Sequence, residues 1–160
     1  MKTRSSRASL PALCLLGAAL AAGPLPAAPG DLPEDHRTLA KSTSYDAMAA
    51  FLKTVDGKGP VTVSEEGKTA QGRNVYLVHA RGSATATFRV LFYAQQHGDE
   101  VSGKDALLYL VRDIAREPSR LPKDVDLWVM PMMNPDGAEA GTRRNSAGAD
   151  LNRDHVTLFQ

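Results

Sequence analysis

The sequence has a single cysteine among its 160 residues, Cys14, which lies in a short apolar segment near the N-terminus. One cysteine cannot form a disulfide within the chain, so disulfide bonds play no part in this fold. The sequence also has almost no net charge, because nineteen basic residues are balanced by eighteen acidic ones. Nothing in this balance favours nucleic acid or an anionic membrane as a partner.

Long apolar runs are also absent, since the most apolar stretch extends only from Leu10 to Ala22. That length is too short to cross a bilayer, and basic residues precede it. Residues 1–22 are therefore predicted to be a secretory signal peptide, and the protein to be secreted or periplasmic, with no stable membrane insertion after the leader is removed. Removal would leave sixteen basic and eighteen acidic residues and no cysteine. A retained anchor or a disordered tail is the alternative interpretation of this segment.

The remaining residues suffice for one domain with one hydrophobic core, although only one Trp, four Tyr and four Phe contribute aromatic rings. Residues 23–41 contain a stretch rich in Pro, Ala and Gly and are interpreted as a linker. The domain is then expected over residues 42–160. It starts with an amphipathic helix capped by Ser44, because Tyr45, Met48 and Leu52 recur at helical spacing.

Strands are predicted at 61–63, 74–80, 88–94 and 125–133, with a second amphipathic helix between the last two. The strand at 88–94 is nearly all apolar, as expected of a strand covered on both faces. This order of elements is typical of an α/β fold, in which ligands gather at the carboxyl ends of strands. His97 and Asn134 each follow such an end. From Asn134 onward the polar, Gly-rich sequence is interpreted as a long functional loop or a poorly ordered segment.

His97 and Glu100 are a candidate pair of metal ligands, because an imidazole and a carboxylate three residues apart at a strand end can bind one Zn²⁺ ion. Gly98 lets the backbone turn between them. By spacing alone, a strand-end histidine beside a solvated acid is an equally good interpretation. His79 is interpreted as an ordinary strand residue.

Two basic segments downstream are candidates for substrate contacts. In Arg143-Arg144-Asn145, a guanidinium near zinc would polarise a scissile carbonyl and stabilise the developing oxyanion. The Asn152-Arg153 pair suits capture of a carboxylate by an arginine fork. Taken singly, each segment is more readily interpreted as an ordinary solvated surface.

In combination, these motifs resemble the zinc carboxypeptidase family of metallopeptidases. The resemblance rests on His97-Gly98-Asp99-Glu100 together with three later segments in the same order and spacing. An upstream turn, 67–73, is also similar to a Gly-x-Ser-x-x-Gly-Arg turn of the family. The later segments are Asn134-Pro135-Asp136-Gly137, Arg143-Arg144-Asn145 and Asp150-Leu151-Asn152-Arg153.

The resemblance implies an α/β fold with a mixed, mostly parallel sheet flanked by helices. It implies that His97 and Glu100 bind Zn²⁺, that Arg143 polarises the scissile carbonyl, and that Asn152 and Arg153 bind the free C-terminal carboxylate of a peptide substrate. The protein is thereby expected to be a zinc metallocarboxypeptidase that removes C-terminal residues from peptides.

A third zinc ligand, a substrate-capping tyrosine and a general-base glutamate of the family have no counterpart in these 160 residues. We therefore expect an inactive N-terminal fragment of the catalytic domain, with an apolar sheet edge left exposed. Two alternatives stay open. One is a zinc-dependent N-acyl amino acid hydrolase similar to aspartoacylase and succinylglutamate desuccinylase, and the other is a non-catalytic carboxylate-binding domain.

Overall fold

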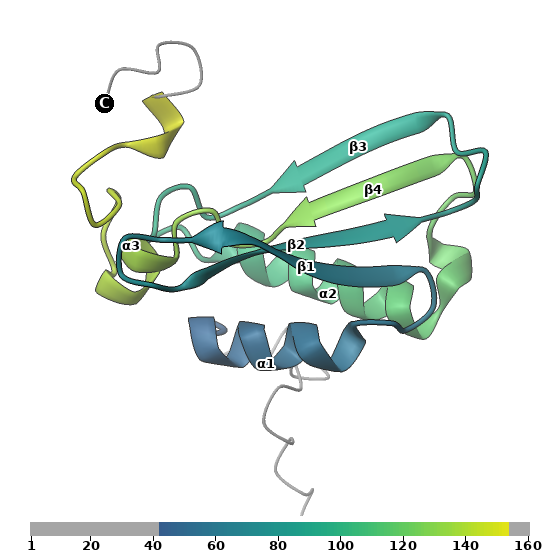
Figure 1. The fold of residues 1–160 in the computed structure, drawn as a ribbon, viewed down its shortest axis with the longest axis horizontal. Helices are drawn as coiled ribbons and strands as arrows, with labels where there is room; N and C mark the ends of the chain where they lie inside the picture. Colours follow the sequence, from purple (N-terminus) through teal and green to yellow (C-terminus); the bar gives the residue numbers. More distant parts are fainter. Residues whose placement is uncertain (1–41, 154–160) are drawn as a thin grey trace, which may run out of the picture.

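The computed structural model describes residues 42–153 (Figure 1). The predicted signal peptide at 1–22 and linker at 23–41 lie outside this range, as do residues 154–160. Among the described residues, no helix has the length and apolar character needed to span a membrane. The elements in chain order are α1 Tyr45–Val55, β1 Val61–Lys68, β2 Asn74–Arg81, β3 Phe88–Tyr93, α2 Ser102–Arg116, η2 Pro118–Arg120, β4 Val125–Met130, α3 Pro135–Ala140 and η3 Leu151–Arg153.

The four described strands form one mixed sheet in the order β1-β2-β4-β3. The mixed sheet and its flanking helices confirm the expected fold class, but the sheet is less parallel than predicted. β3 pairs with β4 in parallel, whereas β2 pairs antiparallel with both β1 and β4. The turn at 69–73 is too short for a crossover, so β1 and β2 have to form an antiparallel hairpin.

The core lies between the sheet and the two long helices, α1 and α2, which lie on the same face of the sheet (Figure 1). Ser44 caps α1 as predicted, because its hydroxyl accepts a hydrogen bond from the Ala47 N–H at 3.2 Å. Burying each large apolar side chain stabilises the fold by about 1.5–3 kcal/mol. The helices contribute mainly Met48, Phe51, Leu52, Val55, Leu108, Val111 and Ile114 to this core, and the sheet contributes Tyr76, Val78, Leu127 and Val129.

β3 departs from the prediction that both of its faces are covered. Four of its large apolar side chains are about half exposed, namely Phe88 at 60%, Leu91 at 56%, Phe92 at 46% and Tyr93 at 47%. The physical reason is its position, because among the described strands β3 pairs only with β4 and forms the edge of the sheet. The expectation of an exposed apolar edge is met.

The segment from Asn134 is more ordered than the predicted loop. The Asn134 side chain caps α3 by accepting a hydrogen bond from the Gly137 N–H at 3.0 Å, and Pro135 occupies the first turn. Both residue types are favoured at these positions, so the sequence did contain the signal for this short helix. β4 ends at Met130 instead of 133, because Pro131 has no N–H to continue the ladder.

The connection after β3 packs directly against α3. A Cβ atom on Gly98 would overlap the backbone of Gly137 and the amide nitrogen of Ala138. Neither backbone group can rotate away as a flexible side chain would. Glycine at position 98 is therefore required by the close approach of two backbones, and the turn itself does not require it, because Gly98 does not have a positive φ.

We expect Gly98→Ala to lower the free energy of unfolding by about 1–3 kcal/mol or more, because an added methyl group overpacks this contact. Gly67→Ala is the matched control, since a Cβ there meets no atom within 4 Å and the residue does not have a positive φ. Urea unfolding followed by circular dichroism measures both. Equal stability of the two variants would show that the contact is not tight.

Asp136, in the first turn of α3, ties this helix to the β1–β2 turn. Its buried carboxylate accepts hydrogen bonds from Thr69 Oγ1 at 2.7 Å, the Gln71 N–H at 3.2 Å, Arg73 Nη1 at 2.8 Å and Ser146 Oγ at 2.7 Å. Burial alone would raise the pKa of Asp136, but these four donors together lower the pKa below its ordinary value. Two of the sequence motifs, the 67–73 turn and Asn134–Gly137, thus meet at one carboxylate.

A carboxyl group with a lowered folded pKa stabilises the fold above its unfolded pKa of about 3.9, and this contribution is lost as the pH falls through the folded value. We expect Asp136→Asn to reduce stability at pH 7 by about 1.5–3 kcal/mol and to weaken the loss of stability on acidification. The control is Asp124→Asn at an exposed position. Unfolding free energies measured from pH 7 to pH 3 test this, and a parallel pH dependence in Asp136→Asn and the parent would contradict it.

Candidate metal and substrate site

The site begins at a strained turn that follows β3. Gln95 has φ of 52°, in the left-handed region that residues other than glycine seldom adopt. Its side-chain Nε2 donates to the carbonyl of Gly98 at 2.9 Å, and the Glu100 N–H donates to the carbonyl of His97 at 3.1 Å. These contacts close the turn so that the His97 and Glu100 side chains face each other. The role of Gln95 was not foreseen from the sequence.

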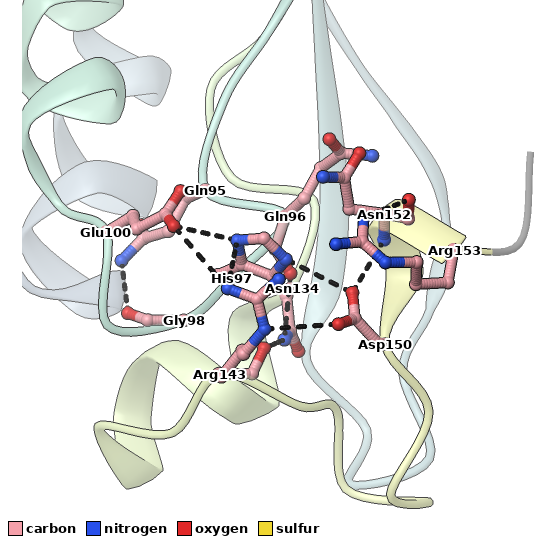
Figure 2. Close-up of polar contacts among 10 residues, drawn as sticks. All are labelled: Gln95, Gln96, His97, Gly98, Glu100, Asn134, Arg143, Asp150, Asn152 and Arg153. Atoms are coloured by element: carbon pink, nitrogen blue, oxygen red, sulfur yellow. Dashed lines mark hydrogen bonds and ion pairs between the residues drawn. The ribbon is translucent and has the colours of Figure 1, made fainter.

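The imidazole of His97 is held between two carboxylates, one on each ring nitrogen (Figure 2). Nδ1 lies 2.8 Å from Glu100 Oε1, and Nε2 lies 3.1 Å from Asp150 Oδ1. His97 is buried, whereas the Glu100 side chain is 65% exposed. The predicted pair is therefore brought together, with the carboxylate of Glu100 open to solvent.

Arg143 lies beside both members of this pair. Its Nη1 is 3.2 Å from His97 Nδ1 and 3.9 Å from Glu100 Oε1. Nδ1 and Oε1 are 2.8 Å apart, and the tautomer of His97 decides whether Nδ1 donates to Glu100 or is an acceptor. In the tautomer without hydrogen on Nδ1, both atoms are available to one cation.

This donor set fits zinc. A neutral imidazole nitrogen and a carboxylate are two of the ligand types that Zn²⁺ takes, and a histidine ligand commonly donates its other N–H to a carboxylate. His97 and Glu100 are the residues that would hold the ion, and Asp150 would fix the ring orientation. Within residues 42–153, no cluster of three or more His, Cys, Asp or Glu residues is arranged to hold a metal. Asp150 does not complete the set, because it lies at the opposite ring nitrogen.

Asp150 itself is held by three donors. Besides His97, its carboxylate accepts from the Asn152 N–H at 3.1 Å and from Arg143 Nε at 3.1 Å. Burial would raise the pKa of Asp150, but these hydrogen bonds lower it below the ordinary value and keep the group ionised. Asp150 belongs to the motif recognised in the sequence, yet it was given no role there. Only the folded structure shows that it reaches His97.

The two adjacent arginines point to different partners. Arg143 contacts His97 and Asp150, whereas Arg144 Nη1 donates to the carbonyl of Gly148 at 2.7 Å within its own loop. The Arg143 side chain remains 44% exposed, so part of its guanidinium faces solvent. The structure thus places Arg143, the predicted member of the pair, beside the candidate metal ligands.

Asn152 and Arg153 lie in η3, directly after Asp150. Asn152 lines a cleft of about 560 Å³ together with the end of β3, the His97–Glu100 turn and the start of α2. Arg153 is exposed, and its Nη1 donates to the carbonyl of Asn152 at 3.2 Å (Figure 2). All five predicted site residues therefore lie around one end of the sheet, close to the carboxyl ends of β3 and β4.

Comparisons with a family model and with known proteins point to the same family. The zinc carboxypeptidase family model matches residues 48–160. Carboxypeptidase M of Mus musculus is 32% identical over 137 residues, which cover 72% of this chain and 31% of the mouse protein. Carboxypeptidase D of Drosophila melanogaster is 30% identical over 110 residues, covering 55% of this chain and 8% of the fly protein.

Solved structures agree with this result. A metallo-carboxypeptidase of Burkholderia cenocepacia has a TM-score of 0.63 and 33% identity, covering 69% of this chain and 32% of that one. A metallo-carboxypeptidase of Pseudomonas aeruginosa, solved in complex with (2-guanidinoethylmercapto)succinic acid, has a TM-score of 0.57 and 30% identity, covering 69% and 31%. The chain spans about a third or less of the length of these relatives.

The family match includes every residue that contacts the His97 imidazole, and the structural matches cover 69% of this chain. The chain belongs to the zinc carboxypeptidase family.

Proposed function

We propose that this chain carries the metal-binding and carboxylate-binding part of a zinc metallocarboxypeptidase that releases C-terminal residues from peptides. The observation that carries the proposal is the close approach of His97 Nδ1 and Glu100 Oε1, which lie 2.8 Å apart with the Arg143 guanidinium beside them. An imidazole nitrogen and a carboxylate are two of the ligand types that Zn²⁺ takes. Family membership supports zinc as the ion that they bind.

When bound, Zn²⁺ supplies Lewis-acid activation of water and of a carbonyl group at neutral pH. His97 and Glu100 would hold the ion, and Asp150, which contacts Nε2, would fix the orientation of the His97 ring. A catalytic zinc site uses three protein ligands, so a third ligand has to come from outside residues 42–153. We propose that the described residues alone do not suffice for catalysis.

Arg143 is placed to stabilise negative charge next to the metal site. Its guanidinium contacts Asp150 and His97, and the side chain remains 44% exposed. A preorganised donor of this kind favours the oxyanion that develops on a scissile carbonyl. Asn152 and Arg153 are assigned to the free C-terminal carboxylate of the substrate, since an arginine fork and an amide both donate to carboxylate oxygens.

The relatives favour this proposal over the two alternatives. The family model and the similar curated proteins are carboxypeptidases, which supports a peptidase over an N-acyl amino acid hydrolase. A purely carboxylate-binding domain would have no use for the facing His97 and Glu100 groups. The predicted signal peptide supports action outside the cytoplasm, in the periplasm or after secretion.

We expect His97→Ala and Glu100→Ala each to lower zinc affinity by more than about 100-fold, because loss of an outer-shell partner alone costs about 10–100-fold. Asp150→Asn, which changes such an outer-shell partner, should lower zinc affinity by about 10–100-fold. Asp99→Ala is the matched control, since Asp99 is an exposed acid in the same turn. Metal analysis after dialysis against a zinc buffer measures all four, and full zinc content in both ligand variants would refute the assignment.

We expect Arg153→Ala to raise KM for peptides with a free C-terminus by about 10- to 150-fold, since hydrogen bonds to charged groups contribute about 1.5–3 kcal/mol. The rate at which amidated peptides are hydrolysed, and their affinity as inhibitors, should change little. Arg153→Lys keeps the charge but loses the planar fork and should be intermediate. If free and amidated peptides were weakened equally, the carboxylate role of Arg153 would be wrong.

A further inference from the structure

The first turn of α3 lies between the His97 turn and the loop that carries Arg143. Asn134 is buried, with 2% of its surface exposed, and its amide contacts three separate backbone segments. Oδ1 accepts from the Gly137 N–H at 3.0 Å, while Nδ2 donates to the carbonyls of Gln96 at 3.2 Å and Arg143 at 3.4 Å. One side chain therefore joins the residue before His97 to the backbone of Arg143.

The same turn holds the arginine loop at a second point. Asp136 accepts a hydrogen bond from Ser146 Oγ at 2.7 Å, three residues after Arg143. The residues that follow are held by Asn145, whose Oδ1 accepts from the N–H groups of Ala147 at 3.0 Å and Ala149 at 2.8 Å. The loop is thus joined to the first turn of α3 at two positions, Arg143 and Ser146.

Helix capping does not account for these contacts. A cap requires only an acceptor, which Oδ1 provides, and aspartate caps as well as asparagine does. The two Nδ2 hydrogens go instead to carbonyls on either side of the site. A donor that links the two halves of the site is a feature of asparagine that aspartate lacks.

We propose that Asn134, assisted by Asp136, is a positioning residue that fixes Arg143 relative to His97. The inference rests on the proposed function of Arg143, and it adds the element that makes that function possible. Arginine has a long side chain with much rotational freedom, and its guanidinium is useful only if held in place. The hydrogen bond to the Arg143 carbonyl fixes the backbone from which the side chain extends, and the hydrogen bond to Asp150 fixes the guanidinium.

The test measures hydrogen exchange of the Arg143 Nε–H in the metal-free protein by ¹⁵N NMR. This hydrogen is bonded to Asp150 Oδ2 and its signal is identified by its loss in Arg143→Lys. Asn134→Asp keeps the shape and the cap but removes both Nδ2 donors. Ser146→Ala removes the second anchor from an exposed position. Ser44→Ala is the control, because it weakens the cap of α1, away from the arginine loop.

Exchange of the Arg143 hydrogen should accelerate about tenfold in Asn134→Asp, the equivalent of one net hydrogen bond at the upper end of its range, and by less in Ser146→Ala. It should stay unchanged in Ser44→Ala. Unchanged exchange in a folded Asn134→Asp protein would overturn the proposal and leave Asn134 as a cap only. If Asn134→Asp fails to fold, Ser146→Ala decides, with faster exchange in support and parental exchange against.

A kinetic measurement separates this inference from the proposed function. In a zinc-loaded protein that extends to the third metal ligand, with a peptide substrate, Asn134→Asp should lower kcat about ten- to a hundredfold with little change in KM, as expected of a small misplacement of a catalytic group. A rise in KM alone would contradict the positioning role. If that extended parent protein hydrolyses no peptide, the proposed function fails, while the exchange experiment on the present chain still decides whether Asn134 positions Arg143.

Discussion

The site depends on the parallel pairing of β3 with β4. Parallel neighbours end at the same edge of a sheet, so the turn after β3 and the helix after β4 have to meet there. The backbone continues this pairing past the strand ends, because the N–H groups of Met133 and Asn134 donate to the carbonyls of Ala94 and Gln95. His97 and Asn134 are 37 positions apart in sequence, yet this pairing makes them neighbours. Antiparallel pairing of the same strands would place them at opposite ends of the sheet.

Around this edge, each of two buried carboxylates accepts several hydrogen bonds. Asp136 takes donors from the β1–β2 turn, and Asp150 takes donors from His97 and Arg143. Each carboxylate has a lowered pKa and stays ionised, because several hydrogen bonds offset the cost of burial. The Glu100 carboxylate lies at the same edge, but its side chain is mostly exposed and contacts the His97 ring. The solvent-facing carboxylate is thus located at the point where a metal would bind.

Much of this arrangement was predictable from the sequence because it depends on local patterns. The spacing of Met48 and Leu52 predicts α1, and the Ser44 cap follows from the preferences of helix ends. The interpretation of His79 as an ordinary strand residue agrees with its position in β2, where it stacks on Trp128 with ring centroids 4.6 Å apart and bonds to Asp126. These features require only short-range chemistry or the alternation of a strand.

The parts that sequence reasoning missed depend on contacts between distant segments. No spacing rule indicates that Asp150 reaches Nε2 of His97, that Asp136 joins the 69–73 turn to the arginine loop, or that Gln95 adopts a positive φ. The exposure of β3 could not be read from its composition either, because an apolar strand looks the same at the centre and at the edge of a sheet.

The edge position of β3 also bears on how firmly the proposed metal ligands are held. His97 and Glu100 follow a strand that is paired on one side only among the described strands, and four of its apolar side chains remain about half exposed. Edge strands with exposed backbone hydrogen bonds open locally at lower free energy than central strands. Two contacts oppose this local opening, because they attach the turn to α3 independently of β3. They are the packing of Gly98 on Gly137 and the hydrogen bond from Asn134 to Gln96. The geometry of the site is therefore set more by α3 than by the strand that precedes the ligands, and anything that covers β3 would stabilise the ligand turn without having to reshape it.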